Sequence, residues 1–533
     1  MSKIYIKDWL FFKPYDKQAP TDGFYMKVGN DVMHQLIHNE HASELQNYLD
    51  DDDLKRLACF LTSYFEDLIS GSNLWNSFIK VHTRLYNKQL PFYKLDDYFE
   101  EEINPQDVAF LIWYYINTSQ TELFVIPQHE MILEAAVIVY DVFDGAWDDA
   151  PENDRLLSFY TIDENVTDFY QARKLIDDIL FNSYLFLTDT FSDFFERSED
   201  ILDRMEDDPN VIAYLNDLQD GMIHRSRTRL FAFSGKEWVA EIIGKEHKLY
   251  PDFLAMSRKI QGYFLYKGQD NETIFLEHIA SGKKFDLVKK SFEFGDRLTK
   301  PDTIVHFGIV QWRGEWWFSG VHFLTPYDPR IVEDEKSSIH SRAAVAFLDH
   351  QKEDAQTILK NQFEAFLEFN RGSQVAFTAP DKAESFIGSF ISYYNDSLGN
   401  EKTGGTKGNE KPEFKAWGNN TKPDFGDLDS VLLFMNPKNN LEVAVDVSSA
   451  FPLPENPYFD ESKSDEHVRR VLVDEHISTE LAYFCIEHFK TELGFFTQGD
   501  GKLLLGDMDF MLRFWKKDFY HTVPSVSFMG DED

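Results

Sequence analysis

Three histidines near the start of the chain have the spacing of metal ligands. His34, His38 and His41 lie at positions i, i+4 and i+7, which would place three imidazoles on one face of a helix. Imidazole binds zinc readily, and Glu44 could add a carboxylate. The surrounding sequence is polar and carries no HExxH motif, so an exposed polar helix face fits the same pattern. Both interpretations stay open until zinc is tested for an effect on the melting temperature.

A dense basic cluster follows in the middle of the chain. Arg225, Arg227 and Arg229 alternate along the sequence beside His224. In an extended segment this alternation would direct three guanidinium groups to the same side, where they could bind phosphate or nucleic acid. The alternative is that they pair with the many carboxylates of this acidic chain. The first hypothesis expects Arg225→Glu combined with Arg227→Glu to abolish such binding.

The local structure that the sequence predicts most clearly spans residues 303–324, TIVHFGIVQWRGEWWFSGVHFL. Two apolar, β-branched and aromatic runs flank Arg313-Gly314-Glu315, a loop length and composition typical of a β-hairpin. Trp312, Trp316 and Trp317 are too large to leave in water, so we expect the hairpin to form one wall of a β core. The same three indoles are candidate anchors for a protein partner.

A long loop offers two further candidate anchors. Residues 398–424 are rich in Gly, Asn and Lys, and Phe414 and Trp417 lie among the lysines. Aromatic side chains in a long loop can bind a partner, although they can equally pack onto their own domain.

Signatures of catalysis are weak throughout the chain. No nucleophile elbow, phosphate-binding loop or dinucleotide fingerprint is present. Glu475-His476 and Glu487-His488 have the composition of acid–base pairs, but on helices they are better explained as solvated side chains. The sequence points to no particular cofactor, and the balance favours a protein that is not an enzyme.

The net charge of the chain limits the kinds of molecule that can bind to it. The 533 residues include 92 acidic and 53 basic side chains, a net charge of -39. Such a field repels nucleic acid and anionic membranes and favours a basic partner. Residues 221–325 differ, with 16 basic against 12 acidic side chains. This local excess of positive charge supports a domain boundary and keeps nucleic acid as an alternative partner.

The hydrophobic pattern predicts an α+β multidomain protein. Residues 1–220 read as a helical domain, in which Asp53 could cap a helix that ends just before Gly71. Residues 221–325 read as a small five-stranded β-barrel-like domain, SH3-like or OB-like in size. Residues 326–533 read as an α+β domain that contains the long loop. The expected strands cover 262–267, 273–279, 284–288 and the two arms of the hairpin.

The two cysteines, Cys59 and Cys485, are far apart and lie in helix-like apolar patterns. They fit buried thiols in a reducing compartment better than a disulfide. The first residues lack the pattern of a signal peptide, and Met131–Phe143, the longest apolar stretch, is too short to span a bilayer. We therefore expect a cytoplasmic, soluble protein.

Several motifs together resemble a known family. IYIKDWLFFKPYDKQAPTD at the start, GEWWFSG in the middle, and FMNPKNNLEVAV with LLGDMDFMLRFWKKDFY towards the end are similar to a family of Bacteroidetes proteins classed only as a domain of unknown function. The resemblance spans nearly the whole chain. It implies a bacterial cytoplasmic protein and transfers no catalytic residue.

These observations favour a non-enzymatic binding or regulatory protein that uses acidic and aromatic-rich surfaces. Two alternatives remain: a nucleic-acid-associated protein that uses residues 221–325, and a hydrolase whose acids meet only in three dimensions.

Overall fold

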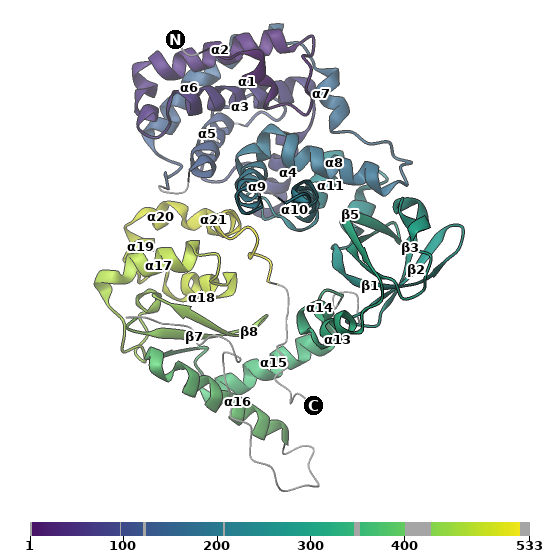
Figure 1. Cartoon of the computed structure of the whole chain (residues 1–533). Helices are drawn as coiled ribbons and strands as arrows, with labels where there is room; N and C mark the ends of the chain where they lie inside the picture. The colour runs from purple at the N-terminus through teal and green to yellow at the C-terminus, as the bar shows by residue number, and fades with distance from the viewer. Residues whose placement is uncertain are drawn as a thin grey trace. The chain divides into compact units, whose positions relative to one another are not determined.

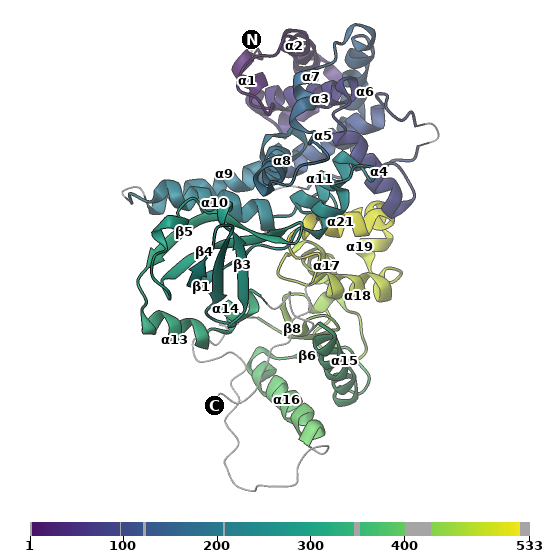
Figure 2. The ribbon, with the colours of Figure 1, turned by 90° about the vertical axis from the view of Figure 1, so that its right-hand side faces the viewer.

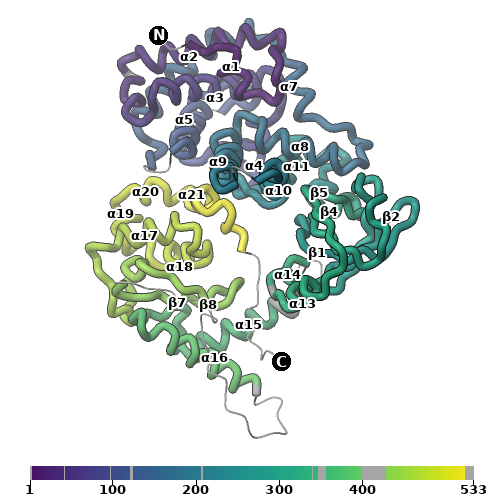
Figure 3. Tube along the Cα trace, viewed as in Figure 1, coloured from purple at the N-terminus to yellow at the C-terminus, as the bar shows by residue number. Residues whose placement is uncertain are grey.

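The structure is a computed structural model that describes residues 3–95, 98–120, 124–205, 208–345, 352–399 and 428–522. The chain forms two compact units, Met1–Ala346 and Phe347–Asp533. Figures 1 and 3 show the elements of each unit. The first unit holds the helices of the N-terminal half and a β-barrel, and the second holds a small sheet with helices.

The first unit begins with helices. They are α1 (Ile6–Leu10), α2 (Asp22–His38), α3 (Asp51–Ser70), α4 (Leu74–Tyr86), α5 (Pro105–Ser119), α6 (Glu130–Asp144), α7 (Asp154–Phe159), α8 (Phe169–Asn182), α9 (Ser192–Arg204), α10 (Val211–Arg225), α11 (Gly235–Ile243) and α12 (Tyr250–Ala255). A 3₁₀-helix, η1 (Glu40–Asn47), follows α2, and a π-helical turn, η4 (Leu187–Phe191), leads directly into α9.

Local sequence explains the ends of the central helix α3. The Asp50 carboxylate accepts the backbone N–H groups of Asp52 and Asp53 at 2.9 and 2.8 Å, and Gly71 ends the helix with a left-handed φ of 63°. The predicted end at Gly71 is confirmed, whereas Asp50 and not Asp53 is the cap. In a run of four aspartates, the one that adopts the extended conformation before the first turn becomes the cap.

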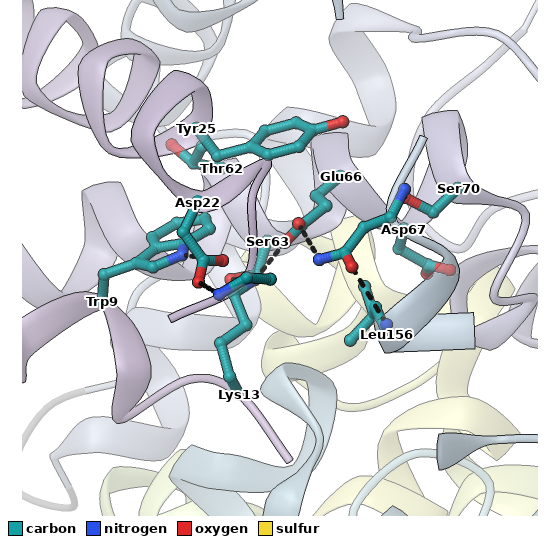
Figure 4. A network of polar contacts seen from close by, with 12 residues as sticks. Trp9, Lys13, Asp22, Tyr25, Thr62, Ser63, Glu66, Asp67, Ser70 and Leu156 are labelled. Atoms are coloured by element: carbon teal, nitrogen blue, oxygen red, sulfur yellow. Dashed lines mark hydrogen bonds and ion pairs between the residues drawn. The ribbon is translucent and has the colours of Figure 1, made fainter. Parts of the chain in front are cut away.

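A buried polar network joins the N-terminal segment to α3 (Figure 4). Trp9 Nε1 donates to Asp22 at 2.9 Å, and the Lys13 ammonium forms an ion pair with Glu66 and donates to Ser63 Oγ at 3.1 Å. The side chains of Lys13 and Glu66 are 1% and 0% exposed. The network fixes the start of the chain against α3, because charges buried this deeply must stay paired.

A second buried carboxyl lies in the first turn of α5. Asp107 accepts hydrogen bonds from the hydroxyl groups of Tyr64 at 3.0 Å and Tyr98 at 3.1 Å, and from Asn104 Nδ2 at 3.3 Å. Burial raises the pKa of Asp107 to about 7, although these donors favour its ionised form. The folded protein therefore binds this proton more tightly than the unfolded chain does.

This shift predicts a pH dependence of stability. Between pH 4 and pH 7 the folded state holds a proton that the unfolded Asp107 releases, so the free energy of unfolding should fall as pH rises, by at most about 1.4 kcal/mol per pH unit. Asp107→Asn should remove this component. Urea unfolding of both proteins at pH 4.5, 5.5, 6.5 and 7.5 measures the difference, and parallel pH profiles would contradict the prediction.

The barrel contains β1 (Ile260–Gln269), β2 (Thr273–His278), β3 (Lys284–Val288), β4 (Ile304–Trp312) and β5 (Glu315–Thr325). The predicted five strands and the hairpin at Arg313-Gly314 are thus confirmed. The strands close in the order β1-β2-β3-β5-β4, with β4 antiparallel to β1 and a parallel contact between Leu287 of β3 and Trp316 of β5. The strands thus form one small closed barrel.

The change from helices to strands comes later than expected. Helix α10 runs through Gly221 to Arg225, and α11 and α12 follow, so the helical region extends to Ala255. Barrel and helices then pack closely: the rings of Trp312 and Phe253 of α12 are 5.1 Å apart, and those of Trp317 and Phe169 of α8 are 6.2 Å apart. The predicted boundary at residues 220/221 stays a prediction. After the barrel come α13 (Pro329–Ser337) and α14 (Ile339–Ala343).

The second unit has the predicted α+β character. Its strands β6 (Val375–Thr378), β7 (Val431–Asn436) and β8 (Asn440–Val445) form an antiparallel sheet in that order. Its helices are α15 (Lys352–Phe369), α16 (Ala383–Gly399), α17 (Ser464–Val473), α18 (Thr479–Phe489), α19 (Gly494–Thr497), α20 (Asp500–Leu504) and α21 (Met508–Trp515). α15 and α16 pack on the sheet through a cluster that includes Phe366 and Phe390.

Both cysteines are buried free thiols, as predicted. Within the part of the chain that the structure describes, none of the helices combines the length and the apolar character needed to cross a membrane.

Candidate functional site

A hollow of about 490 Å³ lies on the second unit. Phe434 at the end of β7, Lys438 in the turn to β8, several residues of α18 and Tyr520 beyond α21 line it. These segments are far apart in the sequence, and the fold of the unit brings them together. We take this hollow, which we call the α18 pocket, as the candidate functional site.

One face of α18 supplies most of the side chains of the pocket. Glu480, Tyr483, Phe484 and Glu487 lie at positions i, i+3, i+4 and i+7, which share one helix face. The opposite face, with Leu481, Ala482, Cys485, Ile486 and Phe489, is buried in the unit. Ser478 caps the helix by accepting the backbone N–H of Leu481 at 3.1 Å.

The two glutamates of the pocket differ in their partners. Glu480 forms an ion pair with Lys438 at 2.8 Å and accepts the Thr522 hydroxyl at 2.8 Å. Burial raises the pKa of Glu480, but Lys438 and Thr522 outweigh it and lower the pKa below its usual value. Glu487, in contrast, is exposed and has no partner among the described residues. Its carboxylate is available to a ligand.

The phenols of the pocket are already engaged. Tyr483 and Tyr520 both donate to one oxygen of Asp509, whose other oxygen accepts Arg513 Nε at 2.9 Å. Burial and these bonds to Asp509 raise the pKa of Tyr483, and they raise that of Tyr520 to about 12. Both phenols are therefore neutral at pH 7, and their rings, with Phe484, form an aromatic wall beside Glu487.

A second hollow of about 340 Å³ on the same unit is lined by Asp429, Asp446, Lys463 and His467. Its acidic groups are engaged within the protein: Asp446 pairs with Arg470, Asp429 pairs with Lys463 at 3.4 Å, and Asp460 accepts the Ser462 hydroxyl at 2.7 Å. His467 Nδ1 accepts the backbone N–H of Ser449 at 3.0 Å. This hollow offers a ligand fewer free groups than the α18 pocket does.

A Ser, a His and an Asp meet in the first unit, where α10 contacts β5. Ser319 Oγ donates to Asp220 Oδ1 at 2.7 Å, and His224 Nε2 lies 3.0 Å from Ser319 Oγ. Lys259 Nζ lies 2.6 Å from Asp220 Oδ2, and Arg173 Nε donates to Asp220 at 2.9 Å. We call this group the Asp220 cluster.

The Asp220 cluster is enclosed. Ser319 and Asp220 are each 1% exposed, so a substrate has no access to the hydroxyl group. Burial raises the pKa of Asp220, but the nearby Lys259, His224 and Arg173 outweigh it and lower the pKa to about 2. Burial lowers the pKa of His224 to about 3. An ionised aspartate, a neutral histidine and two cations thus form a packed joint between helix and barrel.

The predicted arginine cluster is dispersed into internal contacts. Arg225 is the last residue of α10, and Arg227 donates to the carbonyl of Ala232 at 2.7 Å and contacts Glu237 at 3.5 Å. Arg229 forms an ion pair with the buried Asp189 at 3.8 Å. Arg225 ends a helix and Arg229 lies in a turn, so the three guanidinium groups do not project from one extended segment. Binding of phosphate by them stays a prediction.

The three histidines do not share one α-helix. His34 and His38 lie on α2, with ring centroids 4.7 Å apart, but α2 ends at His38 and His41 belongs to η1. The three positions therefore do not lie on one continuous α-helix, and zinc binding by these histidines stays a prediction. Among the described residues, no three His, Cys, Asp or Glu side chains are grouped so that they could hold a metal ion.

The predicted aromatic anchors have different positions. Trp312 and Trp317 are 0% and 1% exposed, so they pack inside the first unit, while Trp316 is half-buried against Phe285. Phe414 and Trp417 lie outside the described residues, and a role for them as anchors stays a prediction.

Sequence reasoning did not single out the α18 pocket. It weighed Glu487-His488 only as an adjacent pair, whereas the useful signal was the spacing of two acids and two aromatic residues at i, i+3, i+4 and i+7. Lys438 and Tyr520 carried no such signal, because only the tertiary fold brings them to the same hollow.

Comparison with known proteins identifies one family. No curated protein and no solved structure matches the chain. The family model described as "Protein of unknown function (DUF3843)" matches residues 3–279, more than half of the chain, from the N-terminal helices through β2. The predicted membership of a domain-of-unknown-function family is confirmed: the chain belongs to the DUF3843 family.

Proposed function

We propose that the protein is a non-enzymatic binding protein whose α18 pocket receives a cationic side chain of a protein partner. The observation that carries the proposal is the unpaired Glu487 carboxylate beside the aromatic rings of Tyr483 and Phe484. A carboxylate next to aromatic faces suits an ammonium or a guanidinium group, which gains both ion pairing and cation–π attraction.

The overall charge supports the same class of partner. A net charge of -39 attracts basic proteins over a distance and accelerates their encounter, while it repels acidic ones. Long-range attraction of this kind selects a class of partner but provides no precise fit. The α18 pocket would add the fit.

A hydrolase remains the weaker alternative. In the Asp220 cluster the Ser319 hydroxyl is enclosed and donates to Asp220 rather than to His224. In the α18 pocket the phenols already donate to Asp509, and the carboxylate that accepts the Thr522 hydroxyl, Glu480, is held in an ion pair with Lys438. The Asp220 cluster is closed to a substrate, and the lowered pKa of Glu480 makes it a weak base for the Thr522 hydroxyl.

A peptide titration tests the proposal. The probes are fluorescein-labelled 12-residue peptides, one with a central Arg in a Gly/Ser background and one with Gln in its place. We expect tighter binding of the Arg peptide, and a loss of roughly fivefold in Glu487→Gln, the size of one partly exposed ion pair. Fluorescence anisotropy at 50 mM NaCl gives both Kd values.

Glu492→Gln provides the matched control. Glu492 is exposed, lies just beyond α18 and does not line the pocket, so the variant changes the net charge equally. We expect its affinity for the Arg peptide to equal that of the wild type. Equal losses of affinity in both variants would mean that binding depends on the net charge and not on Glu487, which would contradict the proposal.

Single-stranded nucleic acid on the barrel is a second candidate, favoured by specific contacts. Arg297 lies over the ring of Phe294 and Lys290 over that of Trp317, each 4.7 Å from the ring centroid. Trp317 itself is buried, but the exposed Lys290 and Arg297 beside the half-buried Phe294 on a small closed barrel resemble a stacking surface, although a shared fold alone is analogy. The acidic Glu277 and Asp286 on β2 and β3 oppose it.

If this candidate is right, Lys290→Ala/Arg297→Ala should weaken binding of a 20-nucleotide oligo(dT) by about tenfold or more. The control Lys490→Ala/Lys502→Ala removes two exposed cations from the second unit and should have no effect. Titrations at 50 and 200 mM NaCl measure both. Binding that is undetectable at 50 mM NaCl would dismiss the candidate.

We propose a cytoplasmic location in a bacterial cell, which fits the two buried free thiols of Cys59 and Cys485.

A further inference from the structure

Helix α9 and the residue before it carry a stripe that the first unit leaves partly open: Phe195 and Leu202 are exposed, and Phe191 and Ser198 are half-buried. None of its side chains is buried, and Phe195 and Leu202 are 54% and 45% exposed. Phe191, Phe195, Ser198 and Leu202 follow one another at intervals of four, three and four residues. This is the spacing of the contact seam of a coiled coil, so another helix is the shape that fits it. We call these four residues the α9 stripe.

The rest of α9 explains how the stripe is held in position. Phe194 packs edge-to-face on Phe181 of α8, with ring centroids 5.5 Å apart, and α9 also lies beside α10 (Figures 1 and 2). At the start of the stripe, the ring of Phe191 contacts that of Phe11, which is 48% exposed, at 5.7 Å. Inward contacts thus anchor α9, while Phe195 and Leu202 face solvent at the edge of the anchored face.

The acidic residues beside the α9 stripe indicate which kind of helix would bind to it. Glu196, Glu199 and Asp203 are exposed and form the next stripe of the helix, one residue further around from Phe195, Ser198 and Leu202. A helix seated on the α9 stripe would therefore meet a row of carboxylates along one side. A second copy of α9 would bring the same carboxylates against each other, which disfavours self-association.

We propose that the α9 stripe is a docking site for a basic amphipathic helix of a partner protein. Apolar side chains of the partner would pack on Phe195 and Leu202, and its lysines or arginines would pair with Glu196, Glu199 and Asp203. The site lies in the first unit, so this inference does not depend on the α18 pocket.

The test uses a designed probe. A 21-residue fluorescein-labelled peptide with Leu at the a and d positions of each heptad and Lys at most others is compared with a scrambled peptide of equal composition, which has the charge but no apolar face. We expect the full-length protein to bind the helical peptide at least tenfold more tightly than the scrambled one. Anisotropy at 150 mM NaCl limits binding by charge alone.

Three variants locate the binding. Phe195→Ser/Leu202→Ser should lose at least tenfold in affinity for the helical peptide, and Glu199→Lys/Asp203→Lys, which keeps the apolar residues, should also lose affinity. Leu133→Ser/Val137→Ser is the matched control, because it removes an exposed apolar i, i+4 pair from α6 and should bind like the wild type. Circular dichroism melts establish that each variant is folded.

Other outcomes would overturn the inference. Equal binding of the helical and scrambled peptides would reduce the interaction to charge, and a loss confined to the α6 variant would place the site on α6. A wild-type dimer in sedimentation that Phe195→Ser/Leu202→Ser dissociates would make a second copy the occupant. Glu487→Gln should leave the affinity for the helical peptide unchanged, which separates this site from the α18 pocket.

Discussion

Replacing Asp220 by Asn should destabilise the first unit by about 3–5 kcal/mol, because the change leaves a buried ammonium group without its carboxylate. Lys259 has a side chain 1% exposed and lies 2.6 Å from Asp220 Oδ2, whereas its other acidic contact, Asp217, is more distant at 3.4 Å. Arg173 and Ser319 would lose the same charged acceptor.

Two glycines show that the fold is shaped around Lys259. A Cβ atom at Gly308 would lie 2.1 Å from Lys259 Cε and 2.7 Å from the backbone oxygen of Ser319. At Gly320, where φ is +89°, a Cβ would lie 2.8 Å from Lys259 Nζ. Since neither position can accept a side chain while the lysine stays in place, the barrel leaves room for this ion pair.

Urea unfolding followed by tryptophan fluorescence measures the effect, since eight of the ten tryptophans lie in residues 1–346. Asp220→Asn/Lys259→Met should recover part of the loss, because it removes both charges. Asp217→Asn, whose side chain is 29% exposed, should change stability by less than about 1 kcal/mol. A loss below about 1 kcal/mol in Asp220→Asn would refute the assignment of the Asp220 cluster as a structural joint.

Replacing Glu66 by Gln should have an effect of similar size, about 3–5 kcal/mol, at the opposite end of the first unit. The change removes the only carboxylate that the described structure pairs with the buried Lys13, leaving the ammonium with Ser63 and the ring of Trp9, 3.8 Å away at its centroid. Asn153 Nδ2, which donates to Glu66 at 2.7 Å, loses the charge of its acceptor.

Two further variants test whether the loss of stability in Glu66→Gln comes from the burial of an unpaired charge. Lys13→Met/Glu66→Leu should be more stable than Glu66→Gln, because it leaves neither charge buried. Lys55→Met, which breaks the partly exposed ion pairs with Asp52 and Asp8, should change stability little. If Lys55→Met and Glu66→Gln proved equally harmful in the same urea experiment, burial would not be the cause.

Local features of the fold were predictable from the sequence. The turn at Arg313-Gly314 and the alternating aromatic runs beside it specify their hairpin within a few residues, as does the αL position at Gly71 for the end of α3. The five barrel strands are marked in the same way, by alternation and turns. Their closure through β1–β4 and β3–β5 depends on residues that are distant in the sequence.

The candidate site was less predictable. Side chains such as Lys438, Glu487 and Tyr520 meet only in the folded unit, so the local pattern on α18 could mark one helix face but not the pocket. Long-range pairing also explains why the arginines do not form one cluster. Arg229 pairs with Asp189, forty residues earlier in the sequence, and Arg227 donates to a backbone carbonyl in the turn that follows it. The excess of acid in the composition indicated such pairing in general but not the individual partners.

The most direct test of the proposed function is affinity purification from the source cells. Tagged wild-type protein, Glu487→Gln and Glu492→Gln are purified at 50 and 150 mM NaCl, and the bound molecules are identified and quantified. The account predicts a basic protein that is stoichiometric with the wild type and with Glu492→Gln and is depleted from Glu487→Gln. Nucleic acid that persists at 150 mM NaCl, or a partner retained equally by all three proteins, would contradict it.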